Sequence, residues 1–147
     1  RAMFATVIGR LYERSFGEIA TSSTHGFIDC DYNVYYGKYV DWAAENEIVA
    51  GVGGSKFAPD INITREQMAA ILYRFAAFLG ILPSEMDDTL EYSDAANISS
   101  YAGDAVLYCQ TNGIFEEKTD GVFAPQETAT RAKVTAIIKR FIETVIK

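Results

Sequence analysis

Hydrophobic residues recur at helical spacing in five stretches of this chain, and segments rich in glycine and proline separate them. The spacing i, i+3, i+4, i+7 predicts amphipathic helices over residues 1–12, 35–47, 64–79, 101–112 and 131–145. In four of these stretches the residues that share one face are Phe4, Val7, Ile8 and Leu11; Tyr36, Val40, Ala43, Ala44 and Ile48; Met68, Ile71, Leu72, Phe75, Phe78 and Leu79; and Val134, Ile137, Ile138, Phe141 and Val145. No long alternating stretch is present, and a short extended piece near Phe57 is the only strand-like element expected. We therefore predict an all-α fold.

The helices belong to a repeat. Lys56-Phe57-Ala58-Pro59 followed by Thr64-Arg65 returns 66 residues later as Val122-Phe123-Ala124-Pro125 followed by Thr130-Arg131. Each complete copy predicts two helices joined by a loop, and residues 1–12 resemble the second helix of a partial copy. The predicted units are residues 1–26, the second helix of a partial first repeat plus a connector; residues 27–82, the second repeat; and residues 83–147, a linker plus the third repeat.

The partial first copy raises two expectations. Because the chain begins with Arg1 inside a repeat, we expect a fragment or a processed form of a longer protein. Two helices cannot bury both of their apolar stripes, so the units must pack on one another. The apolar face of residues 1–12 needs a cover, which the connector, the other repeats or a second chain could supply; the sequence does not choose among these.

Composition and charge exclude several classes of function. The net charge of −7 disfavours binding to nucleic acid or to an anionic membrane surface, and no apolar run approaches the roughly 20 residues of a membrane span. The single histidine, His25, excludes His-based triads and multi-His metal sites. Asp29 opens a sequence that resembles a calcium loop, but Val34 and Val40 replace its glycine and glutamate. We predict no enzyme, cofactor or metal, and we expect Cys30 and Cys109 to be two separate thiols.

The Thr-Arg pair carries the candidate chemistry. Thr64 stands three residues before Gln67, which is the spacing of a capping box, whereas Lys133 follows Thr130 at that spacing. The next residue, Arg65, is a cation at the first helical position, where the helix dipole disfavours it by roughly 0.3–1 kcal/mol.

Arg131 and Arg1 occupy the same place in the other copies. A bound anion could explain these cations, because free N–H groups and a guanidinium would both bind it. An ion pair with Asp29, Asp60 or Glu66 is the structural alternative. An Arg that serves only a ligand could be removed with little effect on thermal unfolding.

Several spaced elements together resemble the S-layer homology repeat: Phe27-Ile28-Asp29, the glycine turn at Gly51, Phe57-Ala58-Pro59 and Ile63-Thr64-Arg65-Glu66. The resemblance covers about two and a half tandem repeats, essentially the whole chain. It implies a pseudo-threefold, prism-like packing of the helical repeats. It also implies anchoring at the bacterial cell surface, outside the cell, through a secondary cell-wall polysaccharide with a terminal pyruvylated sugar. In that family an Arg of the Thr-Arg motif contacts the ligand's carboxylate.

Carried over by position, the resemblance gives a set of candidate glycan-binding residues: Arg65, Thr64, Glu66, Asp29, Trp42, Gly51, Arg131, Thr130, Asp94 and Arg1. Repeat two matches the family pattern better, because repeat three has Lys133 in its motif and Glu116-Glu117 where repeat two has Ala50-Gly51. Two acidic residues there would repel an anionic ligand. Trp42 and its counterpart Tyr108 could stack on a sugar or could be packing residues.

Two functions follow as hypotheses. The first is a non-catalytic anchoring module that binds an anionic, pyruvylated wall glycan through its Thr-Arg helix starts. The alternative is a structural, self-associating module, a homo-oligomer whose incomplete repeat is completed by another chain.

Overall fold

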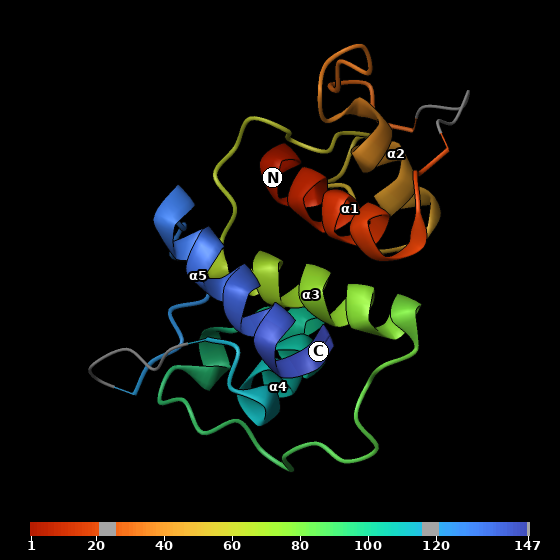
Figure 1. The fold of residues 1–147 in the computed structure, drawn as a ribbon. Helices are drawn as coiled ribbons and strands as arrows, with labels where there is room; N and C mark the ends of the chain where they lie inside the picture. The colour runs from red at the N-terminus through yellow and green to blue at the C-terminus, as the bar shows by residue number, and fades with distance from the viewer. Residues whose placement is uncertain (21–25, 116–120, 147) are drawn as a thin grey trace. The chain divides into compact units, whose positions relative to one another are not determined.

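A computed structural model describes residues 1–20, 26–115 and 121–146, and the described chain is all-α, as predicted. It has five α-helices: α1 (Ala2–Phe16), α2 (Gly37–Glu45), α3 (Arg65–Leu79), α4 (Gly103–Asn112) and α5 (Arg131–Phe141) (Figure 1). Short turns of other helix types are η1 (Ala95–Asn97), η2 (Ser100–Ala102) and η3 (Ile142–Ile146). Within the described ranges the extended pairing is limited to two isolated bridges, Gly53 with Lys56 and Thr64 with Thr128.

The chain divides into two compact units, 1–62 and 63–147, which are offset from the sequence repeats. Each unit begins with the second helix of one repeat, α1 or α3. It continues with the first helix and the loop of the following repeat. The repeat seen in the sequence therefore supplies its two helices to different units. The pseudo-threefold arrangement stays a prediction.

In unit 1, α1 packs against α2 (Figure 1). A Cβ at Gly9 would collide with the ring of Tyr39, so the glycine permits the close approach of the two helices. Phe4 and Ile8 of α1 are fully buried, and Tyr12 stacks on Trp42 with 5.0 Å between ring centroids. The apolar face of α1 is thus covered by the other residues of unit 1. This answers the question that the sequence left open, and the cover requires no second chain.

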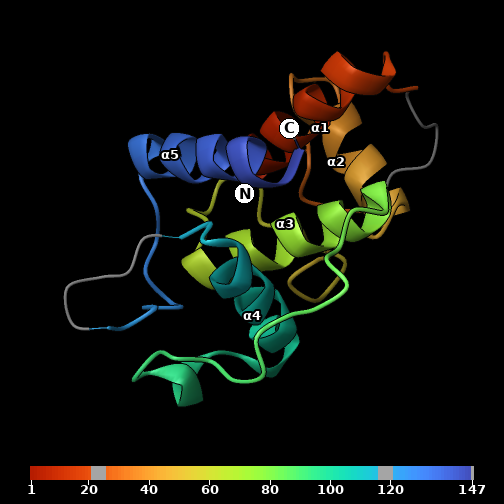
Figure 2. The same cartoon turned by 60° about the horizontal axis from the view of Figure 1, so that its bottom comes forward.

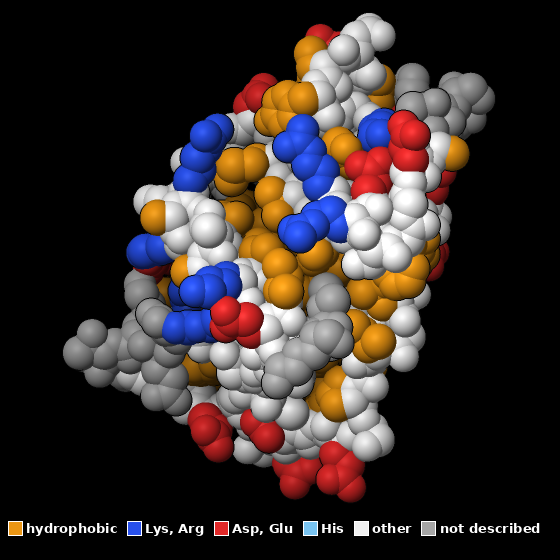
Figure 3. Space-filling view, in the orientation of Figure 1, with side chains coloured by type: hydrophobic (Ala, Val, Ile, Leu, Met, Phe, Trp, Pro, Cys, Tyr) orange, Lys and Arg blue, Asp and Glu red, His pale blue; other side chains and the backbone are white. Residues whose placement is uncertain are grey.

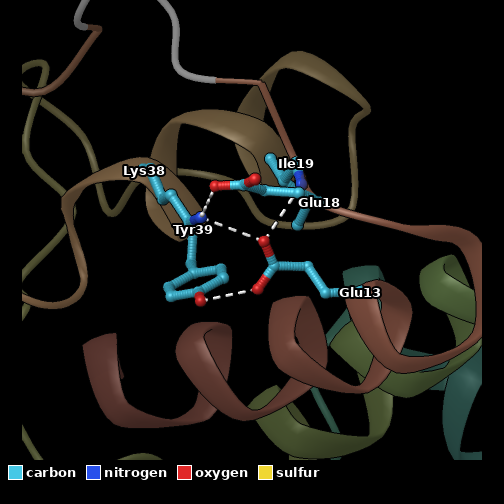
Figure 4. Close-up of polar contacts among 5 residues, drawn as sticks. All are labelled: Glu13, Glu18, Ile19, Lys38 and Tyr39. Carbon is cyan, nitrogen blue, oxygen red and sulfur yellow. Dashed lines mark hydrogen bonds and ion pairs between the residues drawn. The ribbon is translucent and has the colours of Figure 1, made fainter.

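A carboxylate joins α1, the segment after it, and α2 (Figure 4). The Oε1 atom of Glu13 accepts a hydrogen bond from Tyr39 at 2.7 Å. Its Oε2 atom accepts from the backbone N–H of Ile19 at 3.0 Å and from Lys38 Nζ at 2.9 Å. The Ile19 N–H, the Tyr39 hydroxyl and Lys38 together outweigh burial and lower the pKa of Glu13 to about 2. Glu13 therefore stabilises unit 1 while it is ionised.

In unit 2, α3 packs against α4, and both views place α3 between α4 and α5 (Figures 1 and 2). Aromatic pairs connect these helices: Tyr73 with Tyr108 at 5.4 Å and Phe75 with Phe141 at 6.1 Å between centroids. The buried apolar residues of α5 are Val134, Ile137, Ile138 and Phe141, as the periodicity predicts. The α3 stripe ends earlier than predicted, because Phe78 is 37% exposed.

Two helices begin later than predicted. Helix α2 starts at Gly37, whose N–H bonds to the carbonyl of Val34 in a preceding turn. Helix α4 starts at Gly103, because the single turn η2 precedes it. The ends of α3 and α4 are sharper: Gly80 and Gly113 adopt left-handed conformations (φ 73° and 63°) that glycine tolerates best.

Candidate functional site

The start of α3 is capped as the sequence predicts. The Thr64 hydroxyl accepts a hydrogen bond from the N–H of Gln67 at 3.3 Å, and the Gln67 side chain accepts from the N–H of Thr64 at 2.9 Å. This capping box fixes the backbone on either side of Arg65. Thr130 caps α5 in the same way through the N–H of Lys133, without the reciprocal bond from position 133.

Arg65 is held by the Phe-Ala-Pro loop of the following repeat. Its Nε donates to the carbonyl of Phe123 at 2.6 Å, and its guanidinium lies 5.0 Å from the ring centroids of both Phe123 and Phe115. Arg65 is only 7% exposed. The ion pair with a carboxylate considered from the sequence is replaced by a bond to a backbone carbonyl and two aromatic faces.

The loop that receives Arg65 is itself fixed by Asp94. The two carboxylate oxygens accept hydrogen bonds from the N–H groups of Phe123 and Ala124, each at 2.8 Å. Ala124 adopts a left-handed backbone (φ 55°), which costs a non-glycine residue roughly 1–2 kcal/mol. The two bonds to Asp94 hold the strained conformation in place.

Unit 1 contains the same arrangement. Arg1 Nε donates to the carbonyl of Phe57 at 2.8 Å, and its guanidinium lies 4.6 Å from the Phe57 ring centroid. Asp29 accepts from the N–H groups of Phe57 and Ala58, both at 2.8 Å, and Ala58 has φ 58°. Burial alone would raise the pKa of Asp29, but these two N–H groups outweigh it and the pKa is lowered. We call this repeated set of an Arg, a Phe and an Asp the clasp.

The first N–H groups of α3 also take part. Those of Arg65 and Glu66 donate to the carbonyls of Glu127 and Pro125, at 2.9 and 3.1 Å. In unit 1 the corresponding bonds run from Arg1 to Ile61 and from Ala2 to Pro59, at 2.9 and 3.1 Å. The free N–H groups that we expected to bind an anion at these helix starts are therefore already bonded to loop carbonyls.

Glu66 and Gly51 have structural partners of their own. Glu66 is 2% exposed and accepts from the N–H and hydroxyl of Ser99 at 3.0 and 2.6 Å, and from Tyr101 at 3.1 Å. A Cβ at Gly51 would lie 2.7 Å from the Lys56 carbonyl oxygen, so no larger residue fits without a shift of the loop. The candidate residues of repeat two therefore lie in two different units, with Arg65 and Glu66 in one and Asp29, Trp42 and Gly51 in the other.

The two aromatic candidates are buried. Trp42 is 7% exposed and Tyr108 is fully buried, which favours the packing interpretation of both. Among the residues that the structure describes, the Tyr108 hydroxyl has no hydrogen-bond partner. Burial, with the neighbouring Cys109, raises the pKa of Tyr108 to about 12.

Arg131 differs from the other two motif arginines. It is exposed, and its side chain makes no hydrogen bond or ion pair with any described residue. Helix α5 carries four cations, Arg131, Lys133, Lys139 and Arg140, and no acidic residue. Several Lys and Arg side chains lie where α5 runs, whereas acidic side chains gather near the segment between α3 and α4 (Figures 1 and 3). Glu116, Glu117 and His25 lie outside the described residues.

Other chemistry is limited. Over the described ranges, no group of three or more His, Cys, Asp or Glu side chains is placed to hold a metal ion. Cys30 and Cys109 are separate thiols, as expected, and burial raises the pKa of both. None of the described helices combines the length and the apolar character needed to cross a membrane.

Sequence reasoning found the arginines, the Asp residues and the caps, but it missed their partners. The carbonyls of Phe57 and Phe123 carry no side-chain signal, although the repetition of Phe-Ala-Pro marked both loops. Phe115, Ser99 and Tyr101 had no signal that pointed to these roles.

Comparison with known proteins places these observations in a family. The chain is 34% identical over 142 residues to an endoglucanase of Bacillus sp. (strain KSM-635), covering 97% of this chain and 14% of that protein. It is 32% identical over 93 residues to cell surface glycoprotein 1 and 30% identical over 95 residues to a cellulosome-anchoring protein, both of Acetivibrio thermocellus. Each match covers 63% of this chain, and 4% and 20% of those proteins. The chain thus spans a fifth or less of each of these relatives. The family model of the S-layer homology domain matches residues 32–69 and 91–132, and the chain belongs to this family.

Proposed function

We propose that this chain is a non-catalytic module that anchors a larger protein to the bacterial cell surface by binding an anionic, pyruvylated wall polysaccharide. Membership of the S-layer homology family supports the anchoring role, as do the names of two relatives, a cell surface glycoprotein and a cellulosome-anchoring protein. The endoglucanase match covers only 14% of that enzyme, so its activity is not assigned to this chain.

The observation that carries the proposal is the fixed cation at a helix start. The bond from Arg65 to Phe123 and the two phenyl rings orient the guanidinium before any ligand arrives. A pre-oriented cation loses less side-chain entropy on binding a carboxylate than a mobile one. The chain as a whole carries a net charge of −7, so a few fixed cations select the anionic group locally.

The clasp changes the mode of binding that the sequence suggested. Because the first N–H groups of α3 bind loop carbonyls, we place the sugar carboxylate at the exposed edge of the Arg65 side chain. The cationic surface of α5 attracts the same polymer through longer-range electrostatics, which salt screens within about 8–10 Å.

Co-sedimentation with purified cell-wall sacculi tests the anchoring role. We expect the chain to pellet with intact sacculi and to stay in the supernatant with sacculi from which the secondary polysaccharide has been extracted. Equal pelleting with both would contradict polysaccharide binding. The variant Arg65→Lys keeps the charge but loses the planar fork and Nε, and we expect it to bind more weakly at a temperature where it remains folded.

A further inference from the structure

Helix α5 presents a surface that its two counterparts keep covered. Arg131, Ala132, Thr135 and Ala136 are all exposed. The corresponding residues of α3 are Arg65, Glu66, Ala69 and Ala70, and none is more than 7% exposed. In α1, the counterparts of the last three are Ala2, Ala5 and Thr6, none more than 3% exposed.

The covering partner is the same in both units. It is the helix and loop that follow in the chain, α2 or α4 with its Phe-Ala-Pro loop. The loop offers three carbonyls at alternate residues: Phe57, Pro59 and Ile61 in unit 1, or Phe123, Pro125 and Glu127 in unit 2. The first carbonyl receives the Arg Nε, and the other two receive the first two N–H groups of the helix.

Helix α5 carries the same donors without these acceptors. Thr130 caps the helix and fixes its first turn, as Thr64 does in α3. Over the described residues, neither the N–H groups of Arg131 and Ala132 nor the Arg131 guanidinium has an acceptor. The exposed side chains on this face are small, like those that admit a neighbouring helix in α1 and α3.

We propose that the face of α5 formed by Arg131, Ala132, Thr135 and Ala136 docks a further half-repeat, consisting of a helix and an Asp-braced Phe-Ala-Pro loop. Two copies of the same donor set already hold such a loop in this chain, so the chemistry of the occupant follows from the contacts. A second copy of the chain does not fit this role, because Arg1 and Arg65 already hold both of its loops. The docked half-repeat would form a third clasp, with Arg131 on its Phe carbonyl.

An extended chain tests the proposal directly. A copy of residues 18–62 appended after Lys147 places its Phe57 at the same distance along the chain from Arg131 as Phe57 is from Arg1, namely 56 residues. We expect amide hydrogen exchange at Arg131 and Ala132 to slow at least about tenfold relative to the 147-residue chain. Light scattering should show that both proteins are monomers.

Two variants of the extended chain are matched controls. Arg131→Gln should lose most of the added protection in the extended chain and change nothing in the original one. Replacing Asp29 by Asn in the appended copy alone should weaken the protection as well, because that loop loses its brace.

Three outcomes would overturn the proposal. The first is equal exchange at the start of α5 in both proteins, including the case in which the appended copy stays unprotected, because α5 would then have failed to capture it. The second is protection that survives Arg131→Gln unchanged, which would mean that the Arg makes no clasp. The third is slow exchange in the original chain that disappears on dilution, which would make a second copy the occupant.

Discussion

Replacing Arg65 by Ala should destabilise unit 2, contrary to what a purely ligand-binding arginine would do. The lost hydrogen bond to Phe123 is buried and has a charged donor, a class worth about 1.5–3 kcal/mol. Contacts with the two phenyl rings add about 0.5–1 kcal/mol each. The truncation also leaves the Phe123 carbonyl without this donor. We therefore expect a loss of about 3 kcal/mol in the free energy of unfolding.

Thermal unfolding followed by circular dichroism measures this loss. At 2–4 °C per kcal/mol, the Tm of Arg65→Ala should fall by roughly 6–12 °C. Arg131→Ala is the matched control, since the same residue type at the same helix position is exposed and without these contacts. Its effect should stay within about 0.5 kcal/mol, the usual range for a surface substitution.

A comparison of the two variants decides the matter. If Arg65→Ala and Arg131→Ala melt within a degree or two of each other, the clasp does not stabilise the fold and the reasoning fails. Arg65→Lys refines the result, because it retains the charge near the rings but removes Nε. Its Tm should lie between those of the native chain and the alanine variant.

Three other substitutions probe separate features. Glu13→Gln should cost about 1–2 kcal/mol at pH 7; because the folded pKa of Glu13 is lowered from 4.5 to about 2, native stability falls as pH drops through this window, and urea melts should converge with those of the variant near pH 2. A persistent gap at pH 2 would show that ionisation is not the cause. Tyr108→Phe removes a buried hydroxyl without a described partner, so its midpoint in urea should stay level or rise; a loss above about 1 kcal/mol would reveal a hydrogen bond. Asp94→Asn should speed amide exchange at Phe123 and Ala124, and unchanged exchange would show that the carboxylate does not brace the loop.

The helices could be predicted from the sequence because their periodicity is strong. The caps at Thr64 and Thr130, the glycine ends and the buried face of α5 all depend on residues within one turn of each other. Helix starts were harder: α2 and α4 begin two residues later than predicted, because local turns compete with the helix at Val34–Tyr36 and at η2.

Partners could not be predicted where a backbone carbonyl is the acceptor. The Arg65 side chain bonds to the Phe123 carbonyl, 58 residues away, and no property of the Phe123 side chain announces that bond. Similarly, the repeat implied that two helices of one copy form a unit, whereas α2 and α3 belong to different units. Repetition reveals which segments are equivalent, but it does not reveal which copies pack together.

The central claim is that this chain binds an anionic wall glycan through its acidic sugar substituent. Isothermal titration calorimetry with a synthetic pyruvylated wall disaccharide, beside the same sugar without pyruvate, tests it most directly. We expect heat of binding with the pyruvylated sugar alone, at a strength that falls as salt is added. Equal binding of both sugars, or of neither, would contradict the claim.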